Sequence, residues 1–205
     1  ALWGSLRLPS QETIPVCHAL LQDPRFFALL LRIDGDQAVR TQAVGCACAG
    51  RLHCANYPRK PRGCLPEFRA SFGHRFSFCC GTCRKRTTAT SVRFLGRRVY
   101  LALVVVLRSS RHAGSNAAAS ALVSLAIPPR TLERWRAWWR DVFTHTPLWL
   151  GACASFMPPL AAEQLPTALL ERFIGTDASQ RLSAMLRFLS PLTARARGMQ
   201  TAHAA

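Results

Sequence analysis

Cysteines crowd into one short part of this chain. Seven of its nine cysteines fall within residues 46–83, at positions Cys46, Cys48, Cys54, Cys64, Cys79, Cys80 and Cys83. Cysteines that merely fill a core would be scattered. The first residues lack the basic start and apolar stretch of a signal peptide, so we expect a reducing compartment. In such a compartment clustered cysteines are more often metal ligands than disulfides. The cluster therefore predicts a small module held together by a metal ion.

Two cysteine pairs have spacings that suit a structural zinc site. Cys80 and Cys83 enclose Gly81 and Thr82, and Cys46 and Cys48 are separated by one residue, one fewer than usual. Four thiolates complete a tetrahedron and leave no position for a catalytic water. We therefore predict structural Zn²⁺ bound by Cys46, Cys48, Cys80 and Cys83. Substitute ligands remain open: His53, Cys54, Cys64 and Cys79. Free thiols and a redox pair of Cys80 with Cys83 are the other interpretations.

The charge balance points to a polyanionic partner. The chain has 27 Lys and Arg residues against 10 Asp and Glu, which gives a formal net charge of +17. Such a field concentrates polyanions, and nucleic acid is the first candidate. An anionic membrane surface is the alternative partner. A genome that favours arginine codons would explain the positive charge without any partner. A membrane span is not expected, because the longest apolar run, residues 99–107, is too short.

The distribution of residue types along the chain predicts an α+β fold that is mostly helical. Residues 1–44 form a helical arm with a helix that starts at Pro24 after Asp23, and residues 45–95 form a zinc-ribbon-like basic module. Residues 96–145 form a helix-turn-helix-like domain, and residues 146–205 form a helical extension with a loose tail. For residues 99–107 we favour a buried helix over a strand.

Two basic arms lie within the module. Pro58 and Pro61 keep the first arm extended, so its cations should project outward for phosphate contacts. The residues of this arm are Arg59, Lys60 and Arg62. The second arm offers cations interleaved with hydroxyl groups, and its cations are Arg84, Lys85 and Arg86, followed by Arg93, Arg97 and Arg98.

A helix pair is predicted after the module. Residues 118–125 would form the first helix, residues 126–129 a turn, and Thr131 would cap the second helix. A core stripe on the second helix would consist of Leu132, Trp135, Trp139 and Val142. The cations Arg130, Arg134 and Arg136 lie outside this stripe, and in a helix-turn-helix they could reach base edges in a major groove.

Together, these features resemble the N-terminal half of a class of bacterial insertion-sequence transposases. The resemblance covers roughly residues 45–145 and rests on the two cysteine pairs, the segments RKRTT and LAIPPRTLERWRAWW, and an apolar helix between them. It implies a zinc ribbon and a helix-turn-helix that bind the terminal DNA of a mobile element. The nuclease domain of such enzymes holds divalent metal with spaced acidic residues. Here only Glu163, Glu171 and Asp177 follow, and they lie too close together for that role.

We therefore expect a bacterial, cytoplasmic, nucleoid-associated protein that binds double-stranded DNA and carries structural zinc. It would be a transposase-related accessory or regulatory protein rather than an enzyme, because no catalytic motif is present. One alternative is a zinc ribbon that docks an acidic protein, such as a polymerase or a transposase. The other is RNA binding, with bases stacked on Phe76 and Phe78.

Overall fold

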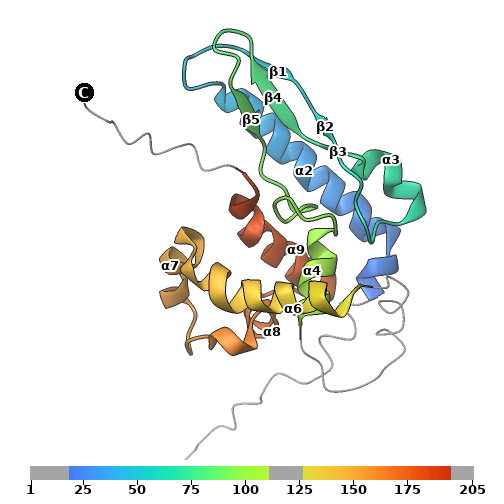
Figure 1. Ribbon diagram of the computed structural model, residues 1–205, viewed down its shortest axis with the longest axis vertical. Coiled ribbons are helices and arrows are strands. Elements are labelled where there is room, and N and C mark those ends of the chain that lie inside the picture. The colour runs from blue at the N-terminus through green and yellow to red at the C-terminus, as the bar shows by residue number, and fades with distance from the viewer. Residues whose placement is uncertain (1–18, 111–126, 195–205) are drawn as a thin grey trace, which may run out of the picture.

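The computed structural model describes residues 19–110 and 127–194 and has an α+β architecture (Figure 1). The helices are α2 (Pro24–Val44), α3 (Arg69–Phe72), α4 (Ala102–Ser109), α6 (Pro129–Ala137), α7 (Pro147–Ala152), α8 (Thr167–Arg172) and α9 (Ala178–Leu189). The strands are β1 (Leu52–Cys54), β2 (Tyr57–Pro58), β3 (His74–Arg75), β4 (Ser77–Cys80) and β5 (Arg86–Thr88). Short helical turns occupy Leu20–Gln22, Pro66–Phe68, Trp138–Val142, Phe143–His145, Cys153–Ser155, Ala162–Gln164 and Ser190–Thr193.

Helix α2 begins where the sequence predicts. The Asp23 side chain accepts a hydrogen bond from the Arg25 backbone N–H at 2.9 Å, and Pro24 occupies the first helical position, where its missing N–H is no loss. The buried face of the helix carries Phe27 and Leu30 among other apolar residues. Of the predicted helical arm, residues 1–44, the structure describes residues 19–44, which hold a short turn and this 21-residue helix packed into the protein; residues 1–18 lie outside the described residues.

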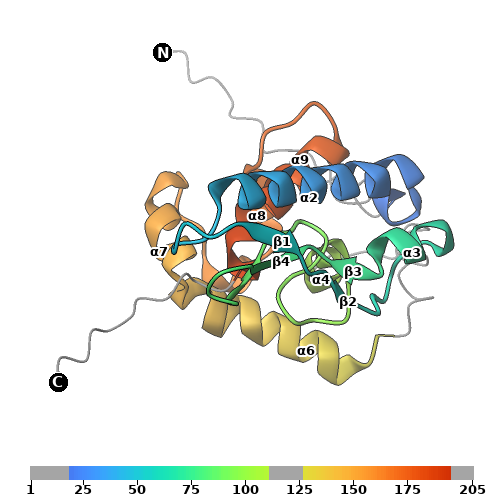
Figure 2. The same ribbon diagram turned by 90° about the horizontal axis from the view of Figure 1, so that it is seen from above.

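A three-stranded antiparallel sheet in the order β1-β4-β5 lies beside α2 (Figures 1 and 2). Its register pairs Leu52 with Cys80 and Phe78 with Thr87. A small apolar cluster fills the space on the helix side of the sheet, and it consists of Ala38, Leu52, Phe78, Cys80 and Ala89. One of these five residues comes from α2, so the small module depends on the helical arm for its cover.

Helix α4 lies at the centre of the main core. All of its apolar side chains are buried, and it contacts both α6 and α9. The prediction of a buried helix over residues 99–107 is confirmed from Ala102 onward, whereas Tyr100 and Leu101 form isolated β-bridges with Arg62 and Phe94. The main core also takes side chains from each of the four segments predicted from the sequence, for example Phe27, Phe72, Leu103 and Leu186. Although α4 is strongly apolar, no helix within residues 19–110 and 127–194 has the length and composition to cross a membrane.

Helix α6 differs from the prediction at its start. The helix begins at Pro129, and the Thr131 backbone N–H donates to the Pro128 carbonyl oxygen at 2.8 Å. Thr131 therefore lies within the first turn and does not cap the helix, because the proline already supplies the helical backbone angle. The first helix of the predicted helix-turn-helix, residues 118–125, lies outside the described residues, so that motif stays a prediction.

A π-helical turn over Trp138–Val142 shifts the apolar stripe that follows α6. Trp135 and Trp139 are buried as predicted, but Val142 is 51% exposed and Phe143 is buried in its place. A π turn accommodates one more residue than an α turn, so the residue that faces the core moves one position along the chain. The prediction for Val142 is wrong for this reason.

A buried ion pair fastens α2 to the segment after β5. The Arg93 Nε donates to the Asp34 carboxylate at 2.6 Å, and both side chains are almost fully buried. The same carboxylate accepts from the Ser91 hydroxyl at 2.5 Å and from the Val92 N–H at 2.6 Å. Arg93 also donates to the Ser71 carbonyl oxygen at 2.9 Å. Its predicted place on a basic arm is wrong, because this carboxylate draws it into the core.

Candidate metal centre

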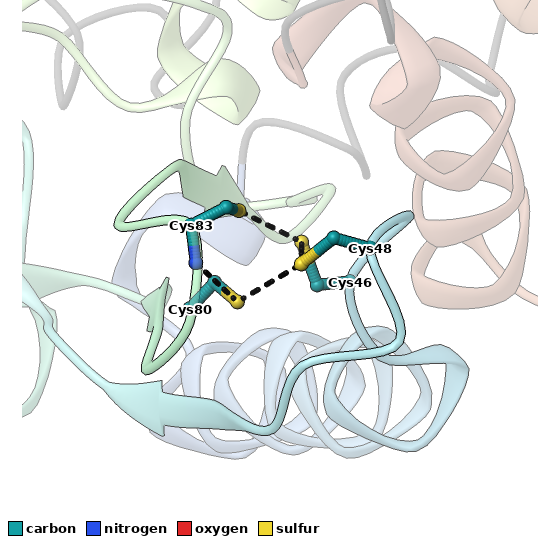
Figure 3. Close-up of side chains that lie close together, drawn as sticks. All are labelled: Cys46, Cys48, Cys80 and Cys83. Carbon is teal, nitrogen blue, oxygen red and sulfur yellow. Dashed lines mark hydrogen bonds between the residues drawn. The ribbon is translucent and has the colours of Figure 1, made fainter.

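The first cysteine pair is placed by the end of α2. The chain leaves the helix through Gly45, whose φ of 72° is a conformation that glycine adopts readily. A tight turn follows, in which the Ala49 N–H donates to the Cys46 carbonyl oxygen at 2.9 Å and Ala49 has a φ of 61°. This turn directs Cys46 and Cys48 toward the β4–β5 loop (Figure 3).

The second pair is placed by the loop between β4 and β5. The Arg84 N–H donates to the Cys80 carbonyl oxygen at 3.1 Å, and Arg84 has a φ of 59°. The Cys80 N–H donates to the Lys85 carbonyl oxygen at 3.0 Å, and the Cys83 N–H points at the Cys80 Sγ at 3.5 Å. Both pairs therefore lie on a tight turn that closes with a left-handed residue.

The four sulfur atoms converge in the space between these two turns. All lie within 4.8 Å of one another, and the pairs Cys46–Cys83, Cys48–Cys80 and Cys46–Cys48 are each 3.5 Å apart. Zinc with Zn–S bonds of about 2.3 Å requires sulfur atoms about 3.8 Å apart, the edge of the tetrahedron. The four residues predicted as ligands thus come together in a group that could hold a metal ion with small side-chain movements.

Gly50 permits this close approach. A Cβ atom at residue 50 would lie 2.5 Å from the Cys80 Sγ and 2.6 Å from the Thr82 Oγ1. Both distances are too short for real atoms, so a side chain at this position would push the two turns apart. The absence of a side chain at residue 50 is therefore a structural requirement of the cluster.

Hydrogen bonds at the cluster favour a thiolate at Cys80. The Cys83 N–H is the main group that lowers the pKa of Cys80 to about 6. The Lys85 N–H lowers the pKa of Cys83, but the contacts of the Cys83 sulfur with the Cys48 and Cys46 sulfurs raise that pKa by more. The net effect is a raised pKa of Cys83. Such crowded thiols resist joint ionisation on their own, and a cation would allow all four to act as ligands.

The substitute ligands considered from the sequence do not belong to this group of four sulfur atoms. Cys64 packs against the main core, where burial raises the pKa of its thiol to about 11. His53 and Cys79 face each other across β1 and β4, and Cys54 ends β1. Among the residues that the structure describes, the only group of three or more potential ligands is Cys46, Cys48, Cys80 and Cys83.

Cations border the cluster on the β4–β5 loop. Arg84 and Lys85 are exposed, and neither side chain has a hydrogen-bond or ion-pair partner among the described residues. Arg86 is exposed as well, but its guanidinium donates to the Ala55 carbonyl oxygen at 2.7 Å and lies over the Tyr57 ring. The loop therefore presents two unpaired cations and a third that is committed to the sheet.

The first basic arm is docked rather than free. The Arg62 N–H donates to the Val99 carbonyl oxygen at 2.9 Å. The Arg59 guanidinium donates to the Arg98 carbonyl oxygen at 2.6 Å, so Arg59 does not project outward as predicted. The carbonyl oxygens of Gly96 and Arg98 accept hydrogen bonds from its guanidinium, whereas Lys60 and Arg62 remain exposed.

The arginines of α6 have two different environments. Arg130 and Arg134 are exposed, whereas Arg136 is half-buried with its Nε lacking a partner among the described residues. Phe78, considered from the sequence as a stacking surface for RNA bases, is 4% exposed and belongs to the small apolar cluster. Phe78 is therefore not available to a base.

Sequence reasoning missed two structural roles near these sites. The closeness of Gly50 to Cys80 has a weak sequence signal, a glycine two residues after the first cysteine pair. The packing of Arg98 over the Trp138 ring at 4.2 Å has none, because it joins residues that are distant in sequence.

Comparisons with known proteins leave the chain without a relative to argue from. No family model matches it, and neither the curated proteins nor the solved structures give a match. The resemblance to insertion-sequence transposases therefore stays a prediction.

Proposed function

We propose that this protein binds double-stranded DNA and that a structural zinc ion holds its basic module together. The observation that carries the proposal is the convergence of Cys46, Cys48, Cys80 and Cys83 within 4.8 Å beside unpaired cations. In this proposal the protein is a transposase-related accessory or regulatory protein and not an enzyme.

The donor set supports zinc in a structural role. Four thiolates in a tetrahedron suit zinc or iron and leave no open position for a substrate. A bound ion would link the residues that follow α2 to the β4–β5 loop (Figure 3). Arg84 and Lys85 would also offset the negative charge of a tetrathiolate centre.

The surface charge supports a polyanionic partner. Only two ion pairs form within the described residues, Asp34–Arg93 in the core and Arg140–Asp141 on the surface. Most surface cations therefore have no carboxylate partner. Arg84 and Lys85 near the cysteines and Arg130 and Arg134 on α6 are cations of this kind. Lys and Arg side chains that neutralise phosphates release counterions, which is a source of affinity for DNA.

Metal content and salt dependence test the two halves of the proposal. We expect about one zinc per chain by elemental analysis, and unfolding at lower temperature after chelation. We also expect duplex binding, measured by fluorescence anisotropy, to weaken with salt by about 0.9 log unit per log unit of salt for each phosphate contacted. A metal-free protein that is fully folded would reject the zinc centre, and a flat salt response would reject the DNA contacts.

Competition separates this proposal from docking of an acidic protein. If the basic surface serves DNA, an excess of bulk duplex should displace any acidic protein that binds it, since both would use the same cations. Single-stranded RNA should compete less well than duplex DNA. An acidic partner that bulk duplex fails to displace would favour the protein-docking alternative.

A further inference from the structure

Arg98 occupies an unusual position between the loop before α4 and helix α6. Its guanidinium lies 4.2 Å from the centre of the Trp138 ring, and its Nη1 donates only a long 3.4 Å bond to the Leu95 carbonyl oxygen. The ring fixes the plane of the guanidinium while most of its donors stay unused. Arg98 is thus a half-buried cation held in place without an anion.

A second cation lies near it. The Trp138 N–H donates to the Arg134 carbonyl oxygen, so Arg134 lies one helical turn before the Trp138 ring that Arg98 covers. Burial, and after it the positive charge of Arg134, lowers the pKa of Arg98 to about 10. Arg134 is exposed on α6, and neither arginine forms an ion pair with a described residue. Two guanidinium groups that repel each other, with no carboxylate between them, favour the binding of an anion from outside the chain.

The first basic arm leads into the same place. Arg62 lies over the Tyr100 ring at 5.7 Å, and that ring packs edge-on against Trp135 at 5.1 Å. Arg59 holds the loop that carries Arg98, because its guanidinium donates to the Arg98 carbonyl oxygen. Aromatic rings of Tyr100, Trp135 and Trp138 therefore lie between arginines that are far apart in the sequence.

We propose that Arg98, Arg134 and Arg62 form a binding site for a backbone phosphate of DNA, here called the arginine seam. The inference rests on the proposed function and adds a second contact surface, apart from the cysteine centre. Figure 1 shows the β4–β5 loop at one end of the long axis and α6 toward the other. In the arginine seam Arg98 and Arg134 contact the phosphate, Arg62 extends the surface, and Arg59 is a positioning residue.

The preorganised geometry suits a phosphodiester. A guanidinium offers parallel N–H donors that match two oxygens of one phosphate, and the Trp138 ring keeps the Arg98 fork from rotating. A bound phosphate would also remove the repulsion between Arg98 and Arg134. Backbone contacts of this kind set position and carry no base preference, so the arginine seam should act alike on different duplex sequences.

Charge-removing variants of the 205-residue chain, loaded with zinc, test the arginine seam. The variants are R98Q and R134Q, and the matched control is R187Q, which removes an exposed cation of α9 that has no side-chain partner among the described residues. We expect R98Q and R134Q to weaken duplex binding about 3- to 10-fold and to lower the salt slope by about one unit, with R187Q close to wild type. If R98Q does not fold, duplex binding by R134Q, which changes an exposed residue, decides the test.

The outcomes separate the arginine seam from the DNA-binding proposal. If wild type binds duplex with steep salt dependence and R134Q binds equally well, the seam is overturned and the DNA-binding proposal stands. If wild type does not bind duplex, that proposal fails, and an NMR titration with inorganic pyrophosphate decides the seam. Saturable shifts of the Arg98 and Arg134 Nε–H signals would then support a phosphate site, and unchanged signals would overturn it.

Discussion

Substitution of Gly50 by alanine should damage the metal centre without touching a ligand. The added Cβ would lie 2.5 Å from the Cys80 Sγ, whereas ordinary contact begins at 3.4 Å, so one of the two must move by about 1 Å. Cys80 is buried and paired with Leu52 in the sheet, so its backbone cannot yield easily. Metal sites tolerate distance errors of roughly 0.2 Å, well below this displacement.

We expect zinc affinity to fall by about 10- to 100-fold, as for other changes in the groups that support metal ligands. This corresponds to about 1.4 to 2.8 kcal/mol. Competition for zinc against a chromophoric chelator measures the affinity directly. Thermal unfolding of the zinc-loaded protein should show a lower midpoint as well, because binding to the folded state contributes to its stability.

Gly35→Ala is the matched control. A Cβ at residue 35 would meet nothing within 4 Å, and the residue lies inside α2. This variant should keep the zinc affinity and gain about 0.5 to 1 kcal/mol in stability from helix propensity. If Gly50→Ala binds zinc as tightly as wild type, the two turns do not approach as closely as the structure indicates, and the argument from geometry fails.

Two further predictions concern the core. Asp34→Ala should lower the free energy of unfolding by about 3 to 5 kcal/mol in chemical denaturation, because it leaves the charge of Arg93 buried and unpaired; a loss equal to that of the exposed control Asp36→Ala would contradict this. Burial raises the pKa of the Cys64 thiol to about 11, so its share of stability is present below pH 9 and lost as the pH rises toward 11. Its alkylation by iodoacetamide, followed by mass spectrometry, should be slow at pH 8 and rise steeply above pH 10, and fast labelling at pH 8 would refute the assignment.

Local sequence signals predicted the group of four cysteines. Two close cysteine pairs can bring their sulfur atoms together if each pair sits on a tight turn, and this holds even for the short spacing of Cys46 and Cys48. Gly45 and the left-handed Ala49 provide the extra bend that the missing residue would otherwise supply. Helix α2 followed from similarly local signals, the cap at Asp23 and the proline after it.

The errors arose where tertiary contacts override local signals. A regular helical period predicts the stripe after α6, and the π turn at Trp138–Val142 breaks that period. The neighbours of Arg93 in sequence predict a basic arm, but its partner, Asp34, lies 59 residues away. The prolines around Arg59 predict an extended arm, but carbonyl oxygens of a loop distant in sequence accept from its guanidinium. Neither the π turn nor these contacts have a signature in a single sequence.

The partners that these arginines have within the protein affect how the net charge of +17 should be interpreted. Arg93 is buried with a carboxylate, and Arg59 and Arg86 donate to backbone carbonyl groups. Such arginines attract a polyanion at long range but offer few donors to a phosphate at contact. The salt slope of DNA binding should therefore follow the smaller set of unpaired cations, including Arg84 and Arg134, and stay well below the value that total charge implies. A slope that matched the total charge would mean that the contacts reach far beyond the cysteine centre and the arginine seam.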